Sequence, residues 1–388
     1  MELDLNLIRK NIDDVDTKLV ELFWERMALC QKVAEYKKNV SKAVRDNKRE
    51  GEIIQRLTQG MNELDKNSVS LLYNTIFEIS RARQNAYINK NNGNTSGFEQ
   101  KIKAACNITG EFPEDAVVAC QGVEGAYSQI ACNMLFKKPS IMYFENFESV
   151  FKSVESGLCK YGVLPFENSI HGSVTEVYDM LSKNDVNVVR SVKLPIHHCL
   201  LAKSGVSLSE ITDIYSHKQA IGQCSNFLSD NKKIKVHICE NTAVAAKMVA
   251  QSDSRTVAAI SSEDCALLYG LDILKKDMQN SGINFTMFYC ISKDLEIYKD
   301  DITKAAFMFN IANRSGSLFN VLARVACIGI NLTKIESRPI CGKDFEFMFY
   351  AEADTKGIDD KLINLFAEFE NELEFFKFIG LYKEITQN

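Results

Sequence analysis

The start of the chain shows a helical pattern of hydrophobic positions. Apolar side chains step by three and four, without proline or glycine, at Leu5, Ile8, Ile12, Val15, Leu19, Leu22, Leu29, Val33 and Tyr36. A period near 3.5 residues is typical of one long helix whose apolar seam packs against partner helices along its length. Shorter helical patterns follow at about 48–57 and 69–87. The pattern therefore predicts an all-α domain over residues 1–88.

The pattern changes twice after this helical region. Residues 89–97 read NKNNGNTSG, a polar stretch that cannot bury apolar surface and predicts a linker over 89–115. Between 116 and 295, short apolar β-rich runs such as AVVACQ and YGVLPFEN alternate with helical patterns, which is typical of an α/β domain with a largely parallel sheet. Two such blocks, 116–184 and 213–270, predict two lobes with a cleft between them.

The last segment of the chain has a third type of sequence pattern. Residues 302–388 predict the order strand, helix, strand, strand, helix, strand, which is the order of the ferredoxin-like α+β unit. Such units bind small molecules or pair with a second copy, and the fold alone does not separate these two uses. The chain is therefore predicted to be a multidomain protein.

Composition and charge restrict the function. The chain has 388 residues, 46% of them hydrophobic, and a formal net charge of −5. We expect no general attraction to nucleic acid or to anionic membranes, so any anionic ligand must be held by locally placed cations. No apolar run approaches the roughly 18 residues that would span a bilayer, and the acidic, periodic start does not resemble a signal peptide. A cytoplasmic protein is expected.

Neither a metal nor a cofactor is expected. The 12 cysteines form no CxxC pair and have no histidine at zinc spacing, so they are expected to be reduced thiols. The segment QGVEGAYSQ lacks the GxGxxG spacing and no P-loop lysine follows it. A glycine turn that lets a substrate approach a helix N-terminus is the better interpretation.

Cations interrupt the apolar seam of the first helix. Arg26 stands where a hydrophobic residue is expected, and Lys37 lies about 20° around the helix and about 16 Å along it, on the same stripe. Arg9 lies about 25 Å from Arg26 on the same helix, so one small ligand cannot touch both in one chain. If Arg9 shares this site, it must come from an antiparallel second protomer.

These residues belong to a longer recognisable pattern. The segment LNLIRKNIDDVDTKLVELFWERMALCQKVAEYKK, followed by VRDNKRE and ISRARQ, resembles the all-helical chorismate mutase domain of bifunctional mutase–dehydratase proteins. The resemblance implies that Arg26 and Arg9 of the partner subunit grip the two carboxylates of chorismate, while Lys37 and Gln84 donate hydrogen bonds to its ether oxygen. It further implies that Glu50 orients the ring hydroxyl and that the pocket is completed by Asp46, Arg49 and Ser80.

The residue types suit this reaction. The rearrangement of chorismate to prephenate is an intramolecular pericyclic shift, which needs no nucleophile, proton donor or metal. The site must instead hold a compact conformer while negative charge builds on the ether oxygen. Arginine and lysine side chains can do both, since arginine pairs with carboxylates in a fixed, bidentate geometry.

A second set of motifs lies in the α/β region. GVEGAYSQIA, YGVLPFENSIHGSV, LPIHHCLL, YSHKQAIGQC and NFTMF occur in the order that characterises the prephenate dehydratase domain, a two-lobed fold like that of periplasmic binding proteins. That family removes carbon dioxide and the ring hydroxyl of prephenate, giving phenylpyruvate without a cofactor. The resemblance implies that Thr286 serves the leaving hydroxyl and that the interlobe cleft is lined by Asn168, Ser169, Ser216, His217, Gln223, Thr242 and Phe288.

One position departs from the family pattern. The family has Thr-Arg-Phe where this chain has Thr286-Met287-Phe288. An active dehydratase is the leading interpretation, because a flanking residue alternates to the opposite side of the strand from Thr286. Two alternatives stay open: an inactive dehydratase module that acts as a regulated sensor, and an arogenate dehydratase, which would share nearly every motif.

The C-terminal unit also carries family motifs. RSGSLFNVLARVACIGINLTKIESRP resembles the ACT regulatory domain of phenylalanine-sensitive dehydratases, with Gly-Ser-Leu in place of the usual Gly-Ala-Leu. The resemblance implies feedback inhibition by L-phenylalanine in a homodimer or homotetramer. The effector site would use Gly316, Ser317, Leu318, Asn331, Leu332, Glu336, Ser337, Arg338 and Pro339.

Overall fold

The computed structural model describes residues 4–40, 44–92, 97–106, 111–299, 302–340, 342 and 346–386. The chain divides into two compact units. Unit 1 holds residues 1–103, 309–353 and 359–376, and unit 2 holds 104–308, 354–358 and 377–388. Each unit is described by itself.

Unit 1 begins with three helices, α1 (Leu5–Asn39), α2 (Asn47–Leu57) and α3 (Glu63–Asn92). The predicted all-helical region is thus confirmed. Helix α3 begins six residues before the apolar pattern (63 against 69) because Asn62 caps it, its Oδ1 accepting a hydrogen bond from the Asp65 N–H at 3.0 Å. Asp4 caps α1 in the same way.

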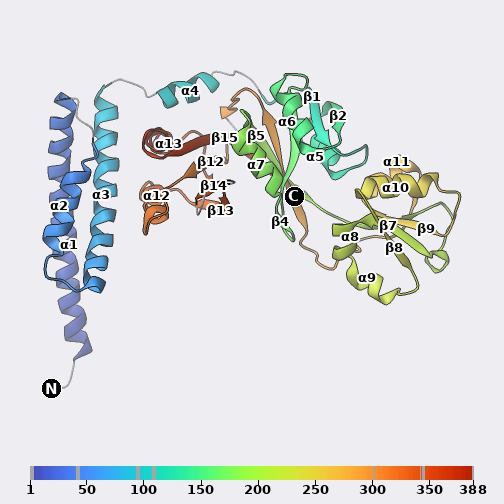
Figure 1. Ribbon diagram of the computed structural model, residues 1–388, viewed down its shortest axis with the longest axis horizontal. Coiled ribbons are helices and arrows are strands. Elements are labelled where there is room, and N and C mark those ends of the chain that lie inside the picture. The colour runs from blue at the N-terminus through green and yellow to red at the C-terminus, as the bar shows by residue number, and fades with distance from the viewer. Residues whose placement is uncertain are drawn as a thin grey trace. The chain divides into compact units, whose positions relative to one another are not determined.

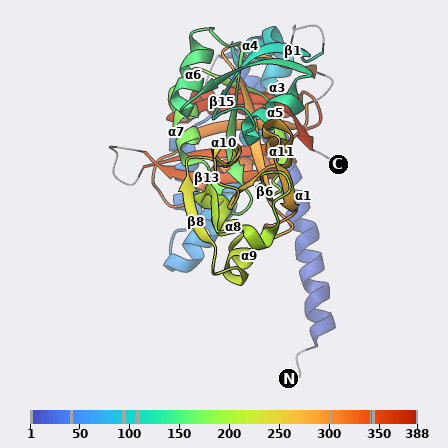
Figure 2. The ribbon, with the colours of Figure 1, turned by 90° about the vertical axis from the view of Figure 1, so that its right-hand side faces the viewer.

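Helix α1 is only partly covered. Its C-terminal half packs on α3 and buries Met27, Ala34 and Lys37, whereas residues 4–22 are all exposed. Figure 1 shows α1 and α3 side by side, with the N-terminal part of α1 running past the start of α3. In Figure 2 the same end of α1 stands clear of the rest of unit 1. The apolar seam from Leu5 to Leu22 therefore has no cover within the described part of one chain.

The predicted linker over 89–115 needs a correction. Helix α3 extends to Asn92, and a further helix, α4 (Gly97–Ala105), lies within the same stretch. The reason is an apolar pair one helical turn apart, since Phe98 and Ile102 are only 3% and 2% exposed. In unit 1 the Phe98 ring packs edge-on against Phe366 at 6.2 Å between centroids.

Unit 2 contains two lobes, each built on its own sheet. Lobe 1 has strands β1 (Asp115–Gln121), β2 (Lys138–Phe144), β3 (Tyr161–Asn168), β4 (Gly172–Ser173), β5 (Asn187–Pro195) and β11 (Phe285–Ser292). They lie in the order β5-β11-β3-β1-β2, with β4 beside β3, and β11 runs antiparallel to both neighbours. Helices α5 (Tyr127–Leu135), α6 (Phe147–Glu155) and α7 (Thr175–Lys183) accompany them.

Lobe 2 has strands β6 (Cys199–Ala202), β7 (Asp213–His217), β8 (Lys235–Cys239), β9 (Val257–Ser261) and β10 (Asp272–Lys275), in the order β10-β6-β9-β7-β8. Its helices are η1 (Leu208–Glu210), α8 (Lys218–Gln223), α9 (Ser225–Asp230), α10 (Thr242–Gln251) and α11 (Glu263–Tyr269). The chain enters lobe 2 after β5 and returns to lobe 1 after β10. The predicted two-lobed α/β architecture is confirmed, but the sheets are mixed and not largely parallel, because the strands that lead the chain between the lobes (β5, β6, β10 and β11) pair antiparallel.

The C-terminal segment has the predicted strand–helix order. Its elements are β12 (Lys304–Asn310), α12 (Ser317–Cys327), β13 (Leu332–Pro339), β14 (Phe347–Asp354), α13 (Asp360–Glu372) and β15 (Phe375–Thr386). The hydrogen-bonded order β13-β14-β12-β15 is that of a ferredoxin-like unit, with β13 at the edge. No helix among the described residues combines the length and the apolar character needed to cross a membrane.

Candidate active sites

The helical region of unit 1 brings two of the predicted mutase residues into direct contact. Arg26 on α1 donates a hydrogen bond from Nη1 to Ser80 Oγ on α3 at 2.7 Å. The Arg26 guanidinium also lies 5.4 Å from the centroid of the Phe77 ring. These contacts fix a cation at the interface of α1 and α3, where the sequence pattern predicts it.

Two further mutase residues are buried near this interface. Lys37 donates a hydrogen bond from Nζ to the carbonyl of Val44. Gln84, one turn after Ser80 on α3, is 7% exposed, and its Oε1 has no hydrogen-bond partner among the described residues. A buried amide oxygen without a partner is costly, so this side chain is suited to a polar ligand.

The start of α2 holds the other predicted mutase residues. Asp46 caps the helix, accepting from the Arg49 N–H at 3.1 Å. The exposed Arg49 side chain lies 3.5 Å from Glu52. Glu50 forms an ion pair with Arg81 of α3, a residue that sequence analysis did not select. The structure thus brings Glu50 to α3 through Arg81.

Arg9 lies apart from these residues. It belongs to the exposed stretch of α1. A rise of 1.5 Å per residue separates it from Arg26 by about 25 Å. One chain therefore does not bring Arg9 to the pair formed by Arg26 and Ser80.

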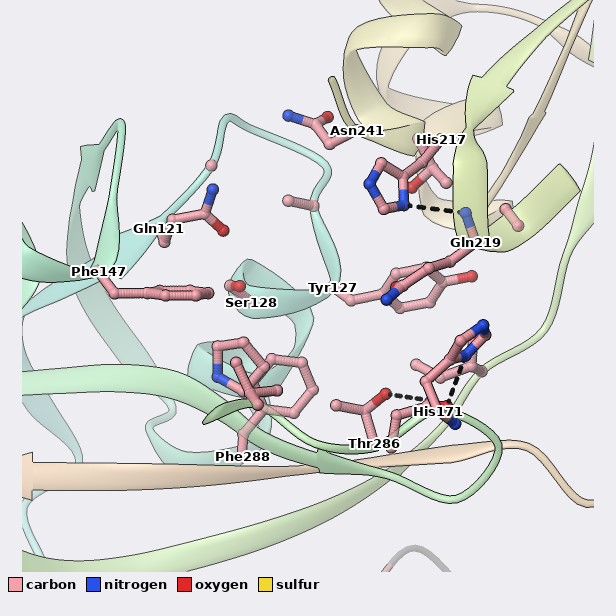
Figure 3. A pocket seen from close by; sticks show the side chains of 18 of the residues that line it. Gln121, Tyr127, Ser128, Phe147, His171, His217, Gln219, Asn241, Thr286 and Phe288 are labelled. Atoms are coloured by element: carbon pink, nitrogen blue, oxygen red, sulfur yellow. Dashed lines mark hydrogen bonds between the residues drawn. The ribbon is translucent and has the colours of Figure 1, made fainter. Parts of the chain in front are cut away.

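The second candidate site is a cavity of about 530 Å³ between the two lobes of unit 2. Figure 3 shows Thr286, Phe288 and His171 on one side of it, with His217 and Asn241 on the opposite side. Six of the predicted dehydratase residues line the cavity: Asn168, His217, Gln223, Thr242, Thr286 and Phe288.

The geometry around Thr286 sets its hydrogen-bonding role. Asn168 Nδ2 lies 3.1 Å from Thr286 Oγ1 and donates to it. The same amide is oriented by the carbonyl oxygens of Asn284 and Phe285, each 3.2 Å from Nδ2. Because Thr286 Oγ1 accepts from Asn168, its own O–H proton is left to donate to a molecule in the cavity.

Gln223 joins the lobes through hydrogen bonds. Its Oε1 accepts from His198 Nε2 at 2.7 Å and from Asn284 Nδ2 at 2.9 Å. Its Nε2 is consequently the donor to His171 Nδ1, 3.2 Å away. The same Nδ1 lies 3.2 Å from Asn168 Oδ1, so His171 links Gln223 of lobe 2 to Asn168 of lobe 1 at the edge of the cavity.

Burial disfavours the charged form of two cavity histidines. It lowers the pKa of His198, against the opposing effect of the hydrogen bond to Gln223. Burial also lowers the pKa of His217, and the nearby His171 adds to this effect. Burial raises the pKa of Tyr127, another lining residue, so the phenol stays protonated. Tyr127 donates to the His197 carbonyl and His198 to Gln223, whereas His217, whose Nδ1 accepts from the Gln219 N–H, keeps its Nε2–H for a molecule in the cavity.

Helix N-termini supply the positive potential. Helices α5, α7 and α10, of nine, nine and ten residues, begin at lining residues Tyr127, Thr175 and Thr242. The lining residues, all within the described ranges, include no lysine or arginine. Unpaired N–H groups and the helix dipole attract anions, so the helix starts are the groups suited to carboxylates here, beside two acidic lining residues, Glu176 in the first turn of α7 and Glu240. The glycine turn before α5, which includes the lining residue Gly122, agrees with the sequence interpretation.

Two predicted cleft residues are placed elsewhere. Ser216 is fully buried in β7, and its hydroxyl donates to the carbonyl of Ile260 at 2.7 Å. It precedes His217 in a strand, where successive side chains face opposite ways, so both cannot line one cavity. Ser169 is exposed, and its Oγ accepts from the Phe285 N–H at 3.1 Å. Neither serine lines the cavity.

Met287 does not line the cavity either, whereas its neighbours Thr286 and Phe288 do. In the sheet it lies opposite Glu167 of β3 and Lys193 of β5. This placement fits the expected alternation along the strand. An arginine at position 287 would lie beside Glu167 rather than beside a molecule in the cleft.

Sequence analysis missed several lining residues, including Tyr127, Ser128, His171 and His198. Tyr127 and Ser128 stand in the GAYSQ motif that opens α5, so the position of a helix start behind a glycine turn was an available signal. His171 lies in the ENSIHG motif. Its link to Gln223 joins residues 52 apart in sequence, and no local pattern could show it.

The C-terminal motifs lie at two places in the ferredoxin-like unit. Gly316, with a φ of 83°, precedes α12, and Ser317 and Leu318 form the first turn of that helix. The segment from Leu332 to Pro339 is the edge strand β13. Asn331 directly precedes this strand. A cavity of about 190 Å³ in unit 1 is lined by Ser317 and by Asn310, which is 4% exposed and whose Oδ1 has no hydrogen-bond partner in the described part of the chain.

Together these features describe a chain with two separate sites for small anionic molecules. No group of three or more His, Cys, Asp or Glu side chains among the described residues could hold a metal ion. The chorismate mutase type II family model matches residues 8–85, and the prephenate dehydratase family model matches residues 118–296.

Known proteins share this arrangement over most of their length. The bifunctional chorismate mutase/prephenate dehydratase of Escherichia coli (strain K12) is 32% identical over 358 residues, covering 90% of this chain and 89% of that protein. The chloroplastic arogenate dehydratase/prephenate dehydratase 2 of Arabidopsis thaliana is 35% identical, covering 68% and 72%. The chain therefore belongs to the family of bifunctional chorismate mutase/prephenate dehydratases and carries both enzyme domains.

A solved structure shares the fold. Prephenate dehydratase from Arthrobacter aurescens, determined in complex with L-Phe, has a TM-score of 0.63 and 24% identity, covering 69% of this chain and 90% of that one.

Proposed function

We propose that this enzyme of phenylalanine biosynthesis rearranges chorismate to prephenate at a site that two chains build together. The observation that carries this proposal is the exposed seam of α1, which bears Arg9 and the uncovered apolar residues from Leu5 to Leu22. An antiparallel second copy of α1 would cover this seam and bring Arg9 of the partner subunit to Arg26.

Within that site each residue has a distinct task. Arg26 and Arg9 of the partner subunit hold the two carboxylates, and Ser80, already bonded to Arg26, keeps that guanidinium in place. Lys37 and Gln84 donate to the ether oxygen as its bond to carbon breaks. Charge develops on that oxygen only in the transition state, so these two donors lower the barrier rather than merely strengthening binding. Asp46, Arg49 and Glu50 would complete the pocket from α2.

We further propose that the interlobe cavity of unit 2 converts prephenate to phenylpyruvate. The carboxylates of prephenate would lie against the N-termini of α5, α7 and α10. As the ring carboxylate leaves as carbon dioxide, its bonding electrons enter the ring and the hydroxyl departs from the opposite carbon. Thr286 donates a hydrogen bond or a proton to that hydroxyl, so that it leaves as water.

The arrangement of Asn168 supports this assignment. Its amide donates to Thr286 Oγ1, which stabilises negative charge on that oxygen and orients the hydroxyl proton toward the cavity. Phe288 on the same strand, with His217, Gln223 and Thr242, completes the enclosure. Ser169 and Ser216 act on this site through the backbone, if at all, because neither side chain lines the cavity.

Prephenate is favoured over arogenate as the substrate of this cavity because the chain has its own mutase domain, which produces prephenate. Purified protein supplied with chorismate and prephenate in separate assays tests the proposal. Prephenate should form from chorismate and phenylpyruvate from prephenate. A preference for arogenate, or prephenate that is bound but never converted, would instead support one of the two alternative functions.

We propose that residues 302–388 form an ACT regulatory domain that binds L-phenylalanine and inhibits the dehydratase. The Gly316–Leu318 turn and the edge strand with Glu336, Ser337, Arg338 and Pro339 would meet those of a second chain in a homodimer or homotetramer. The cavity beside Ser317 and Asn310 supports a ligand site at this turn. Calorimetric titration of the full-length protein with phenylalanine, repeated on Gly316→Val, tests it.

A further inference from the structure

A chain of buried charges joins the mutase helices to the C-terminal helices within unit 1. It runs from Glu50 on α2 through Arg81 and Glu78 on α3 to Arg324 on α12. Except for Glu50, these side chains are at most 10% exposed, and the Glu50 side chain is 23% exposed. Only Glu50 belongs to the residues assigned to the mutase site.

Arg81 lies at the centre of this chain. One of its guanidinium nitrogens bonds Glu50 Oε1 and the other bonds Glu78 Oε1. Burial works against the charge of Arg81, but the two carboxylates outweigh it and raise the pKa of the guanidinium. Arg81 is thus a fixed cation shared between two carboxylates. The position of Glu50 depends on whether the guanidinium of Arg81 keeps its hydrogen bond to Glu50 or moves toward Glu78.

Arg324 lies beside the second carboxylate oxygen of Glu78. Its Nε lies 3.7 Å from Glu78 Oε2, an oxygen that accepts no hydrogen bond among the described residues. Arg324 is itself held by Glu368 and Glu372 of α13 and lies 4.7 Å from the centroid of the Phe369 ring. Helices α12 and α13 therefore present a rigid cation to Glu78.

From these contacts we propose that Arg81 and Arg324 are positioning residues of the mutase site, acting in series through Glu78 to hold Glu50. This inference rests on the proposed role of Glu50 in orienting the ring hydroxyl of chorismate. Without Arg324, Arg81 is the one cation among the described residues that pairs with the buried Glu78 carboxylate, and Arg81 is drawn away from Glu50. Glu50 then loses the contact that holds it in the pocket.

This series of contacts from Glu50 through Arg81 and Glu78 to Arg324, called the relay below, has a structural consequence. Helix α12 begins at the Gly316–Leu318 turn, for which an effector role is proposed, and Arg324 lies two turns further along it. A shift of α12 would therefore change the electrostatic partner of a mutase helix. Loss of the C-terminal contacts should weaken the mutase without any change in its own residues.

Steady-state mutase kinetics on full-length Arg81→Met, Arg324→Met and the double variant test this inference. Because hydrogen bonds between charged groups are strong, Arg81→Met should raise the KM for chorismate by about tenfold and Arg324→Met by about threefold. The double variant should be no worse than Arg81→Met alone, since Arg324 acts only through Arg81. Multiplied losses, or a normal KM in Arg324→Met, would overturn the relay.

Two controls separate the relay from general damage. Arg314→Met removes an exposed arginine from the same C-terminal segment and should leave the KM for chorismate unchanged. Dehydratase activity on prephenate, measured on every variant, reports that unit 2 is folded. If Arg324→Met does not fold, Arg324→Lys, which keeps the charge, should give a KM between wild type and the expected threefold increase, and a wild-type value would contradict the relay.

A third control tests the assumption beneath the proposal. Glu50→Gln should raise the KM for chorismate at least as much as Arg81→Met. If Glu50→Gln leaves the KM unchanged, the assignment of Glu50 to the mutase site is wrong and the relay falls with it. If Glu50→Gln raises the KM while Arg324→Met does not, the assignment stands and the relay alone is wrong.

Discussion

The two candidate sites present different groups to an anionic molecule. The helical region relies on side-chain cations, with Arg26 bonded to Ser80 and Lys37 buried at the same helix. The interlobe cavity has no lysine or arginine among its described lining residues and presents uncharged polar side chains and helix N-termini, beside Glu176 and Glu240. The helical region also leaves Arg9 remote from Arg26, whereas the cavity is enclosed by the two lobes of one chain.

The difference follows from the chemistry. A pericyclic shift needs no proton transfer, so strong charges can surround the substrate and hold its reactive conformer. An elimination needs a proton donor close to its departing hydroxyl, and a nearby lysine or arginine would add little to that task. Helix N-termini can hold carboxylates while the side chains remain available for hydrogen bonding.

The largest effect is expected at Thr286, the proposed proton donor of the cavity. Thr286→Val keeps the side-chain shape but removes the hydroxyl, and it should reduce phenylpyruvate formation by about 1,000-fold or more. Prephenate formation from chorismate should not change, because Thr286 lies in the other unit. Product analysis by liquid chromatography distinguishes the two steps. Residual dehydratase activity near the wild-type rate would remove Thr286 from the reaction.

Met287→Arg provides the matched control beside it. Since Met287 faces Glu167 and Lys193 in the sheet and does not line the cavity, restoring the family arginine should change the dehydratase rate by less than about tenfold. If the wild-type protein accumulates prephenate and Met287→Arg switches the second step on, the wild-type domain is a sensor instead of an enzyme.

In the helical site, Lys37→Ala removes a proposed hydrogen-bond donor, as Thr286→Val does in the cavity. Loss of one donor to the developing charge should reduce the mutase kcat by about 100- to 1,000-fold, with a smaller change in KM. Initial rates over a range of chorismate concentrations give both constants. A raised KM with an unchanged kcat would show that Lys37 only binds the substrate.

A smaller difference between the two sites is expected in how the KM for each substrate depends on salt concentration. Between about 0.05 and 0.5 M salt the Debye length falls from about 14 Å to about 4 Å, which screens the exposed Arg9 and the partly exposed Arg26. We expect the KM for chorismate to rise about fivefold, and the KM for prephenate in the enclosed cavity to change less than about twofold. Equal salt dependence would contradict the contrast between the sites.

The smallest predicted effect is a loss of stability of the folded state at low pH. Burial lowers the pKa values of His198 and His217 from their ordinary value of 6.5. The unfolded chain therefore binds protons first as pH falls, so stability is complete above about pH 6.5 and declines below it. The unfolding temperature of unit 2 should fall by about 2–4 °C toward pH 5.5, as calorimetry would detect. His198→Asn should reduce this decline.

Much of the fold was predictable because its signals are local. The period near 3.5 over the first 36 residues gave α1, and alternating apolar runs gave the two lobes. Helix α4 was missed because its only large apolar residues, Phe98 and Ile102, stand in a short stretch that follows a polar, glycine-containing segment.

The sites were less predictable, since they depend on contacts between distant residues. The pairs Arg26–Ser80 and Arg81–Glu50 are 54 and 31 residues apart. The orientation of Ser216 could have been predicted from the alternation of side chains along a strand. Since His217 was placed in the cleft, its neighbour Ser216 had to face the other way. Nothing in the local sequence marks Arg81, and its burial between two carboxylates is visible only in the fold.

The central claim is that one active site requires two chains while the other is complete in one. Chains carrying Arg9→Ala and chains carrying Arg26→Ala should each lack mutase activity but retain dehydratase activity. After the two are mixed and allowed to exchange subunits, half of the dimers should contain one intact mutase site, restoring about a quarter of wild-type activity. No recovery in a mixture shown to form heterodimers, with dehydratase activity unchanged, would contradict the claim.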